Sequence, residues 1–98
     1  MDRYRILYIL TGTKGGMNRI EILKILMKKS MNANEIKDKL KLDYKTVQHH
    51  LRLLVKNNFI FASGERYGLI YNITNEFKFH KEVFNEILAK VNKLPERS

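Results

Sequence analysis

Apolar residues between positions 32 and 56 follow a helical period in two consecutive segments that a tight turn separates. In the second segment they recur at spacings of four, three and one, as Val47, Leu51, Leu54 and Val55. The opposite face is polar and mostly basic, with Tyr44, Lys45, Gln48, His49, Arg52 and Lys56. Side chains of these types bind base edges and phosphates. The pattern therefore predicts a helix-turn-helix whose second helix is a DNA recognition helix.

Two helix starts carry the same polar signature. Asn18 and Asn32 are each followed three residues later by a glutamate, Glu21 or Glu35, which predicts a capping box at both. An apolar residue before each cap predicts a hydrophobic staple, in the pairs Met17 with Ile22 and Met31 with Ile36. We therefore expect one helix over residues 18–29 and a second that begins after Asn32.

The helix-turn-helix has predicted boundaries of its own. Asp43 caps the recognition helix, and Asn57-Asn58 ends it, because asparagine tolerates the left-handed backbone of a helix C-terminus. Lys41-Leu42 forms the turn. The residues expected in the core from the two preceding helices are Ile22, Leu23, Ile25, Leu26, Ala33, Ile36 and Leu40.

Glycine-containing segments separate the other secondary-structure elements that the sequence predicts. Residues 2–11 are apolar and are expected to form a short helix, although their residue types suit a strand equally well. Residues 12–16 form a break after them. Residues 59–73 contain two runs of β-forming residues around Ser63-Gly64, which predicts a hairpin. A final helix is expected from Asn75 to about Leu94, before Pro95.

Charge strengthens the nucleic-acid interpretation. The 98 residues carry a net charge of +9, of which residues 1–74 hold +8 (14 basic against 6 acidic). The excess thus lies in the helix-turn-helix part, where a polyanion would bind. The absence of cysteine excludes disulfides and thiolate metal sites. No apolar run has the length of a membrane span or a signal peptide, so we expect a single cytoplasmic domain.

The order helix, helix, recognition helix, hairpin, helix resembles a winged helix-turn-helix, an α+β fold. The amino-acid sequence of this region is similar to that of ArsR-type transcription regulators of archaea. The similarity rests on Gly12 to Gly16 followed by Asn18-Arg19, on residues 31–60, and on Tyr67-Gly68 before Ile70-Tyr71. Asp43 to Val47 followed by His49-His50-Leu51 is its most specific part. The resemblance implies a cytoplasmic, usually dimeric, DNA-binding regulator.

The chain departs from the metal-sensing members of that family. They use a cysteine pair near the recognition helix, or a ligand three residues after a histidine on the last helix. Here cysteine is absent, and Val83 stands three residues after His80. His49 and His50 are adjacent, so on a helix they point about 100° apart and share no site. We therefore expect no metal, no other cofactor and no catalytic residue.

The predicted DNA contacts fall into three groups. Lys45, Gln48, His49 and Arg52 are expected to read bases. Tyr44, Thr46, Lys56, Lys14 and Arg19 are expected to contact phosphates, the last two beside the glycine-rich loop, for which a plain linker is the competing interpretation. Arg66 at the hairpin tip is expected to enter a minor groove, unless it is solvated or paired with Glu65.

The terminal segments carry a second apolar pattern. The final helix repeats its apolar residues at a near 3.5-residue period, the spacing of a helix that pairs with another helix. Residues 6–10 form a further apolar run. We therefore expect a homodimer held by residues 2–11 and 75–94 around a DNA-binding core of residues 12–74, unless both ends fold back on the monomer. The expected interface residues are Ile6, Leu7, Leu10, Phe77, Phe84, Ile87, Val91 and Leu94.

The sequence thus predicts a homodimeric regulator of transcription that binds duplex DNA with sequence specificity. Two alternatives stay open. The first is a winged helix that binds proteins, which would present an apolar patch on the recognition face. The second is a basic architectural protein that binds DNA without sequence preference, for which Lys and Arg alone would suffice on that face.

Overall fold

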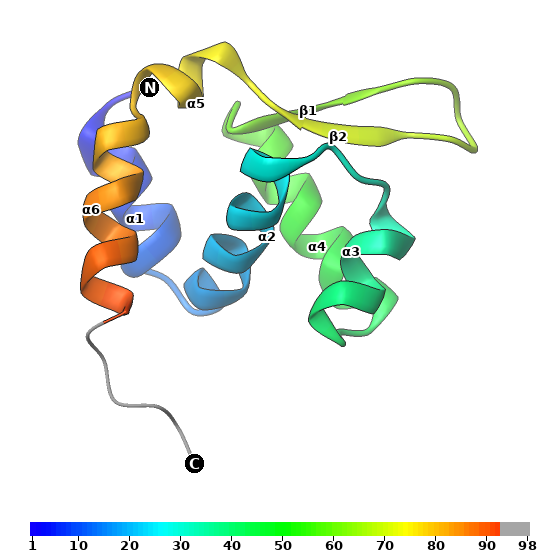
Figure 1. Ribbon diagram of the computed structural model, residues 1–98, viewed down its shortest axis with the longest axis horizontal. Coiled ribbons are helices and arrows are strands. Elements are labelled where there is room, and N and C mark those ends of the chain that lie inside the picture. The colour runs from blue at the N-terminus through cyan, green and yellow to red at the C-terminus, as the bar shows by residue number, and fades with distance from the viewer. Residues whose placement is uncertain (93–98) are drawn as a thin grey trace.

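The computed structural model describes residues 1–92, which form helices and one β-hairpin (Figure 1). The helices are α1 (Arg3–Thr11), α2 (Gly16–Lys28), α3 (Ala33–Leu40), α4 (Tyr44–Lys56), α5 (Asn75–Phe79) and α6 (Lys81–Val91), and the strands are β1 (Ile60–Ser63) and β2 (Ile70–Ile73). The short helix predicted over residues 2–11 is confirmed, and the carboxylate of Asp2 caps it by accepting from the Arg5 amide.

The elements form a winged helix-turn-helix, and the predicted fold class is confirmed. In Figure 1, α1 and α6 lie side by side at one end, α2 occupies the centre, and α3 and α4 lie at the other end. The hairpin extends past α3 and α4 as the wing. Its strands are antiparallel, with Ile60 opposite Ile73 and Ser63 opposite Ile70.

The wing is fastened to the helix-turn-helix through the backbone. The Tyr71 amide donates to the Met31 carbonyl over 2.8 Å, and the Met31 amide donates back to the Tyr71 carbonyl over 3.4 Å. Met31 immediately precedes the capping residue of α3. The start of the helix-turn-helix and the second strand of the wing therefore share hydrogen bonds, which fixes their relative position.

Every helix of the described chain contributes buried residues to one hydrophobic core, and its outer face is exposed to solvent. At its centre Phe77 contacts Phe59 and Phe84, with ring centroids 5.0 and 5.5 Å apart. Aromatic pairs at these separations add to the stabilisation that burial gives. Because Phe59 ends the helix-turn-helix segment and Phe84 lies on α6, this stack packs the C-terminal part onto the helix-turn-helix part.

Most predicted helix ends are confirmed. Asn32 and Glu35 form the capping box, with hydrogen bonds of 2.8 and 3.1 Å. Asp43 caps α4 by accepting from the Thr46 amide over 2.8 Å. Asn58, just beyond α4, adopts the predicted left-handed backbone with φ of 61°.

The capping box and staple predicted at Asn18 are wrong. Helix α2 begins at Gly16, with Gly15 as its cap, so Asn18 lies inside the first turn. Gly15 has φ of +88°, and the Gly16 amide bonds the Thr13 carbonyl. The loop is thereby folded tightly against the end of α1, which starts the helix earlier than the side-chain signal indicates. Met17, the supposed staple residue, is exposed.

The single final helix is also wrong, because α5 and α6 are separated at His80. The hydroxyl of Thr74 caps α5 by accepting from the Phe77 amide, and it donates to the Asn58 carbonyl. These bonds fix where the chain leaves the wing. A change of direction at His80 then lets α6 run beside α1, where Arg3 and Glu86 form a 2.8 Å ion pair. Leu94 lies outside the described residues.

Candidate nucleic-acid interface

Helix α4 presents one polar face to solvent because its apolar face is buried in the core. Val47, Leu51 and Leu54 are buried, as predicted, whereas Val55 is 41% exposed and does not belong to the core. Among the predicted base-reading residues, Lys45, His49 and Arg52 are exposed and Gln48 is half-buried. Lys56 is exposed at the end of the same helix. The geometry thus brings these five polar side chains to one helix.

The first turn of α4 is internally hydrogen-bonded. The Gln48 amide group donates to the Tyr44 hydroxyl over 2.7 Å. The backbone amide of Thr46 is engaged by the Asp43 carboxylate, so it is not the free N–H that the phosphate prediction assumed. The Thr46 side chain, followed by its backbone amide, holds the pKa of Asp43 below its usual range by hydrogen bonding to the carboxylate. Tyr44 is exposed and remains available to a phosphate.

A cleft of about 300 Å³ separates the wing from the helix-turn-helix. Tyr44, Gln48, Arg66 and Tyr67 line it, together with Asn34 near the start of α3. Arg66 lies over the Tyr67 ring, 5.9 Å from its centroid, and within residues 1–92 no ion pair joins it to Glu65. Sequence reasoning missed Tyr67, which is 96% exposed. An aromatic residue beside a turn arginine was the available signal.

Arg19 cannot contact a phosphate, which corrects the prediction for the glycine-rich loop. Its side chain is 2% exposed, and its guanidinium bonds the Ile9 carbonyl, the Lys14 carbonyl, the Thr13 hydroxyl and His50. A guanidinium has five N–H donors, and here they are directed inward. Lys14 is exposed and stays available.

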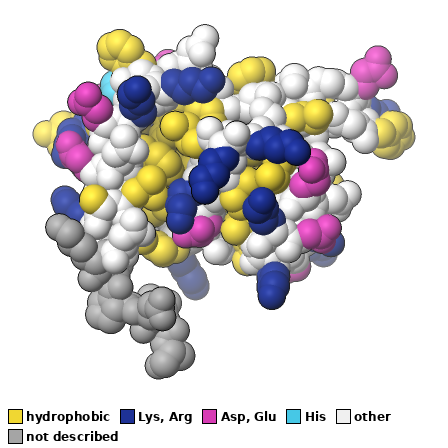
Figure 2. All heavy atoms as spheres, viewed as in Figure 1, with side chains coloured by type: hydrophobic (Ala, Val, Ile, Leu, Met, Phe, Trp, Pro, Cys, Tyr) yellow, Lys and Arg dark blue, Asp and Glu magenta, His cyan; other side chains and the backbone are white. Residues whose placement is uncertain are grey.

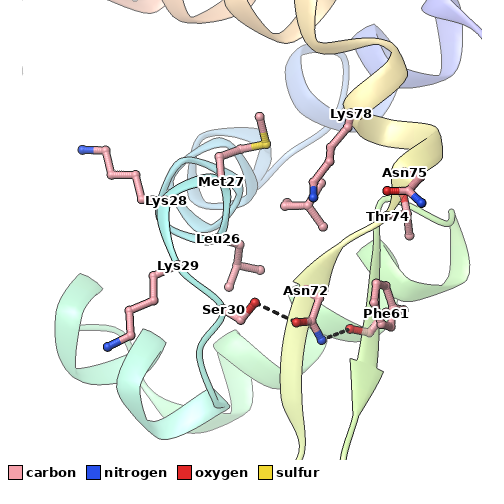
Figure 3. Close-up of a pocket in the computed structure, with 11 residues that line it drawn as sticks. Leu26, Met27, Lys28, Lys29, Ser30, Phe61, Asn72, Thr74, Asn75 and Lys78 are labelled. Carbon is pink, nitrogen blue, oxygen red and sulfur yellow. Dashed lines mark hydrogen bonds between the residues drawn. The ribbon is translucent and has the colours of Figure 1, made fainter.

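A second basic surface lies apart from the outward face of α4. A cleft of about 460 Å³ between the end of α2, the hairpin and α5 is lined by Lys28, Lys29 and Lys78 together with polar groups such as Asn72 (Figure 3). Lys78 extends from α5 toward the cleft, whereas Lys28 and Lys29 extend outward from α2. Figure 2 shows Lys and Arg side chains gathered over the middle of this face. The sequence did not single out this cluster, because Lys28 and Lys78 are 50 positions apart in the chain.

Most of the predicted dimer-interface residues belong to the core of the single chain. The buried ones are Ile6, Leu10, Phe77, Phe84 and Ile87, each no more than 3% exposed. The apolar period of the terminal segments therefore reflects packing of α1 and α6 on their own domain. Leu7 and Val91 are half-buried and line a groove of about 270 Å³ between α1 and α6. Beside it on α1, Tyr4 and Tyr8 are 81% and 62% exposed.

The described residues hold neither a metal-binding cluster nor a membrane-spanning helix. Residues 1–92 contain no group of three or more His, Asp or Glu side chains placed to hold a metal ion. No helix within that range is both long and apolar enough to cross a membrane.

These elements define a winged helix-turn-helix protein with an exposed basic recognition helix. Residues 17–60 match the model of the bacterial regulatory protein arsR family, which confirms the ArsR-type resemblance for the segment that contains α2, α3 and α4. A comparison with curated proteins finds no match.

Solved structures share the fold. HlyU from Vibrio cholerae superposes with a TM-score of 0.67 at 19% identity, covering 87% of this chain and 90% of that one. A homodimeric winged helix-turn-helix DNA-binding domain from Mycobacterium bovis, described as a possible ArsR-family regulator, gives 0.70 at 17% identity over 97% and 83%. A MarR transcriptional regulator from Methanosarcina mazei gives 0.70 at 20% identity over 97% and 78%.

Proposed function

We propose that the protein is a transcription regulator that binds duplex DNA with sequence specificity as a homodimer. In this proposal α4 enters the major groove, where Lys45, Gln48, His49 and Arg52 read bases. Phosphate contacts come from Tyr44, Lys56 and Lys14, and Arg66 reaches a minor groove from the wing tip. Residues 12–74 form the DNA-binding core.

The observation that carries the proposal is the combination of charge and amide groups on the outward face of α4. A surface that only attracts a polyanion needs cations alone. Here Gln48, held by Tyr44, and the exposed imidazole of His49 stand among the cations Lys45 and Arg52. Amide and imidazole groups distinguish base pairs by their donor and acceptor pattern. This composition favours sequence reading over nonspecific binding.

Binding of the wild type and Arg52→Ala to a selected duplex and to random duplex tests the proposal. If Arg52 reads a base, its loss costs roughly 1–3 kcal/mol on the selected site and little on random DNA. Lys81→Ala, which removes an exposed cation from α6, serves as the control and should change neither. Failure of the wild type to bind any duplex at low salt would refute DNA binding.

For the homodimer we propose the outer face of α1 and the groove that it forms with α6. Tyr4 and Tyr8 are one turn apart and form an exposed aromatic ridge, and Leu7 and Val91 line the adjacent groove. Exposed aromatic side chains of this kind are enriched in protein interfaces. The homodimeric state of the Mycobacterium bovis domain supports the same assembly. Two subunits would place two recognition helices on a two-fold site.

Sedimentation tests this interface. Tyr4→Glu with Tyr8→Glu should yield a folded monomer at concentrations where the wild type is a dimer, because two charges would be buried in the contact. Tyr67→Glu is the control: it makes the same change at the wing tip, far from α1 and α6 (Figure 1), and should leave the dimer intact. A monomeric wild type at micromolar concentration would refute the homodimer.

The lysine-lined cleft favours a second candidate function, that of an architectural protein which binds DNA nonspecifically through two faces. Lys28, Lys29 and Lys78 line a different cleft from the one that Tyr44 and Gln48 line. If this function holds, Lys28→Glu with Lys78→Glu should weaken binding to random duplex and to the selected site alike. If the regulator function holds, the double substitution should leave affinity for the selected site nearly unchanged.

A further inference from the structure

Arg19 and His50 form a buried junction at the centre of the DNA-binding core. Arg19 lies on α2 and His50 on the inner face of α4, and they are 2% and 5% exposed. The Arg19 Nη1 and the His50 Nδ1 are 3.1 Å apart. The other guanidinium donors reach the end of α1 and the loop after it, at Ile9, Thr13 and Lys14. One side chain thus links α1, the loop, α2 and the recognition helix.

Within residues 1–92 no carboxylate forms an ion pair with Arg19. Its partners are two carbonyls, a hydroxyl and an imidazole. The Ile9 carbonyl belongs to the last turn of α1, where backbone carbonyls carry partial negative charge. Arg19 therefore caps α1, and its charge is stabilised by dipoles that hold it at one place. Burial lowers its pKa, yet an arginine remains protonated in proteins.

This geometry determines the protonation state of His50. A guanidinium can only donate, so the His50 Nδ1 must accept and must carry no proton. The neutral ring then has its proton on Nε2. Burial, followed by the charge of Arg19 and by His49, lowers the pKa of His50. The charged and titratable groups that face the ring are Arg19 from α2 and His49 from α4 itself, and neither would stabilise a second positive charge.

The loop is shaped to admit this pair. A Cβ added at Gly15 would lie 2.8 Å from the His50 Cε1 and 3.2 Å from the Arg19 Nη1. Gly15 also has φ of +88°, which L side chains rarely adopt. A glycine is therefore required where the loop passes over the two side chains.

We propose that Arg19 and His50 are positioning residues that set the recognition helix relative to α1, and that DNA binding requires an uncharged His50. The proposal rests on the proposed DNA-binding function. Protonation of His50 places two cations at hydrogen-bond distance inside the core and removes the acceptor for Nη1. The recognition helix then loses its fixed attachment to α1 and the loop, although none of its outward side chains has changed.

The sign of the pH effect separates this proposal from ordinary electrostatics. Protonation of the exposed His49 adds positive charge to the recognition face and should strengthen binding to a polyanion on acidification. Protonation of the buried His50 should weaken it. Below the pKa of His50, affinity should fall by up to about tenfold per pH unit.

The experiment measures affinity for a fixed duplex between about pH 5 and 8, at constant ionic strength, for the wild type and two variants. His50→Asn keeps an oxygen that accepts from Arg19 but does not titrate, so its affinity should no longer fall on acidification. His80→Asn, which replaces a histidine with no side-chain hydrogen bond in the described chain, should behave like the wild type. If His50→Asn does not fold, His50→Gln replaces it. Wild-type affinity that rises or stays level on acidification would overturn the proposal.

NMR of the free protein keeps this result independent of DNA binding. The His50 ring should titrate below the usual value of about 6.5, and amide signals of α4 and of residues 9–15 should move with it. A His50 ring that titrates at or above the usual value, with the α4 amides unmoved, would overturn the positioning role. Failure to bind any duplex at any pH, with the NMR result as expected, would refute the proposed function and leave the coupling of the two helices established.

Discussion

Gln48 and Tyr44, one turn apart on the outward face of the recognition helix, share a 2.7 Å hydrogen bond in which the amide group donates to the phenol. A side-chain amide has two N–H donors and one oxygen acceptor. With one donor engaged by Tyr44, the oxygen and the second donor remain. These are the two groups that form a bidentate pair with adenine. The phosphate-contact candidate thus orients the base-reading candidate.

Tyr44→Phe should therefore reduce discrimination at the base pair that Gln48 reads. The substitution keeps the ring and removes only the acceptor, so we expect a loss of roughly 0.5–1.5 kcal/mol in preference for the best base. Competition binding with duplexes that differ at one position measures it. Tyr67→Phe is the control because no hydrogen bond involves the Tyr67 hydroxyl in the described chain. Equal losses for all four bases would instead assign Tyr44 to a phosphate.

Alanine substitutions at Asn32 and Asn18, which share the same sequence signature, should change the free energy of unfolding by different amounts. Asn32 accepts from the Glu35 amide and is a true cap, whereas Asn18 lies within the first turn of α2. Asn32→Ala should lower the free energy of unfolding by roughly 0.5–2 kcal/mol. Asn18→Ala should change it by less than about 0.5 kcal/mol, because alanine favours a helix interior. Urea unfolding of both variants checks the pair, and equal losses would contradict the observed helix start.

That comparison shows what local sequence signals can predict. The capping box at Asn32, the cap at Asp43 and the hairpin depend on neighbours a few residues away, so the pattern suffices for them. At Asn18 the same signal was overridden by Gly15 and Gly16, which bring the loop against α1. Tertiary packing decided where that helix begins.

The candidate functional surfaces also differ in how far local sequence patterns predict them. The outward face of α4 follows from helical periodicity, so Lys45, His49 and Arg52 could be placed without a structure. Periodicity shows which residues are apolar but not what covers them. Phe77, Phe84 and Ile87 were therefore assigned to a second chain although their own domain buries them. The burial of Arg19 depends on contacts with residues up to 31 positions away, which no local pattern contains.

Asp43 should make folding stability dependent on acidic pH. Hydrogen bonding from the Thr46 side chain, followed by that from the Thr46 amide, lowers the pKa of the Asp43 carboxylate in the folded protein. The contribution is therefore fully present above the unfolded pKa of about 3.9 and is lost as pH falls through the lower folded value. Asp43→Asn retains a cap without titrating, so thermal melts between about pH 2 and 5 should show a weaker pH dependence than the wild type. Identical profiles would contradict this role.

The wing should add affinity without sequence preference. Arg66 lies at the tip of the hairpin with no ion pair in the described chain, beside the exposed Tyr67. If it contacts one phosphate or the minor groove, Arg66→Ala should weaken binding to all duplexes alike. It should also reduce the slope of log affinity against log salt by about one unit. Lys81→Ala should leave that slope unchanged. An unchanged slope for Arg66→Ala would place the wing tip away from DNA.

Gly16 should tolerate no side chain, in contrast to Gly68. A Cβ at Gly16 would lie 2.2 Å from the Leu10 carbonyl oxygen, a backbone atom that cannot rotate away. Alanine favours a helix over glycine by about 1 kcal/mol, but the clash must separate α1 from α2, and overpacking of this kind costs about 1–3 kcal/mol or more. We therefore expect Gly16→Ala to be destabilising in spite of its position in a helix. No atom lies within 4 Å of a Cβ at Gly68, so Gly68→Ala should be neutral or slightly stabilising. Thermal unfolding of the two variants gives the comparison, and a stabilised Gly16→Ala would mean that α1 and α2 are not in contact at Leu10.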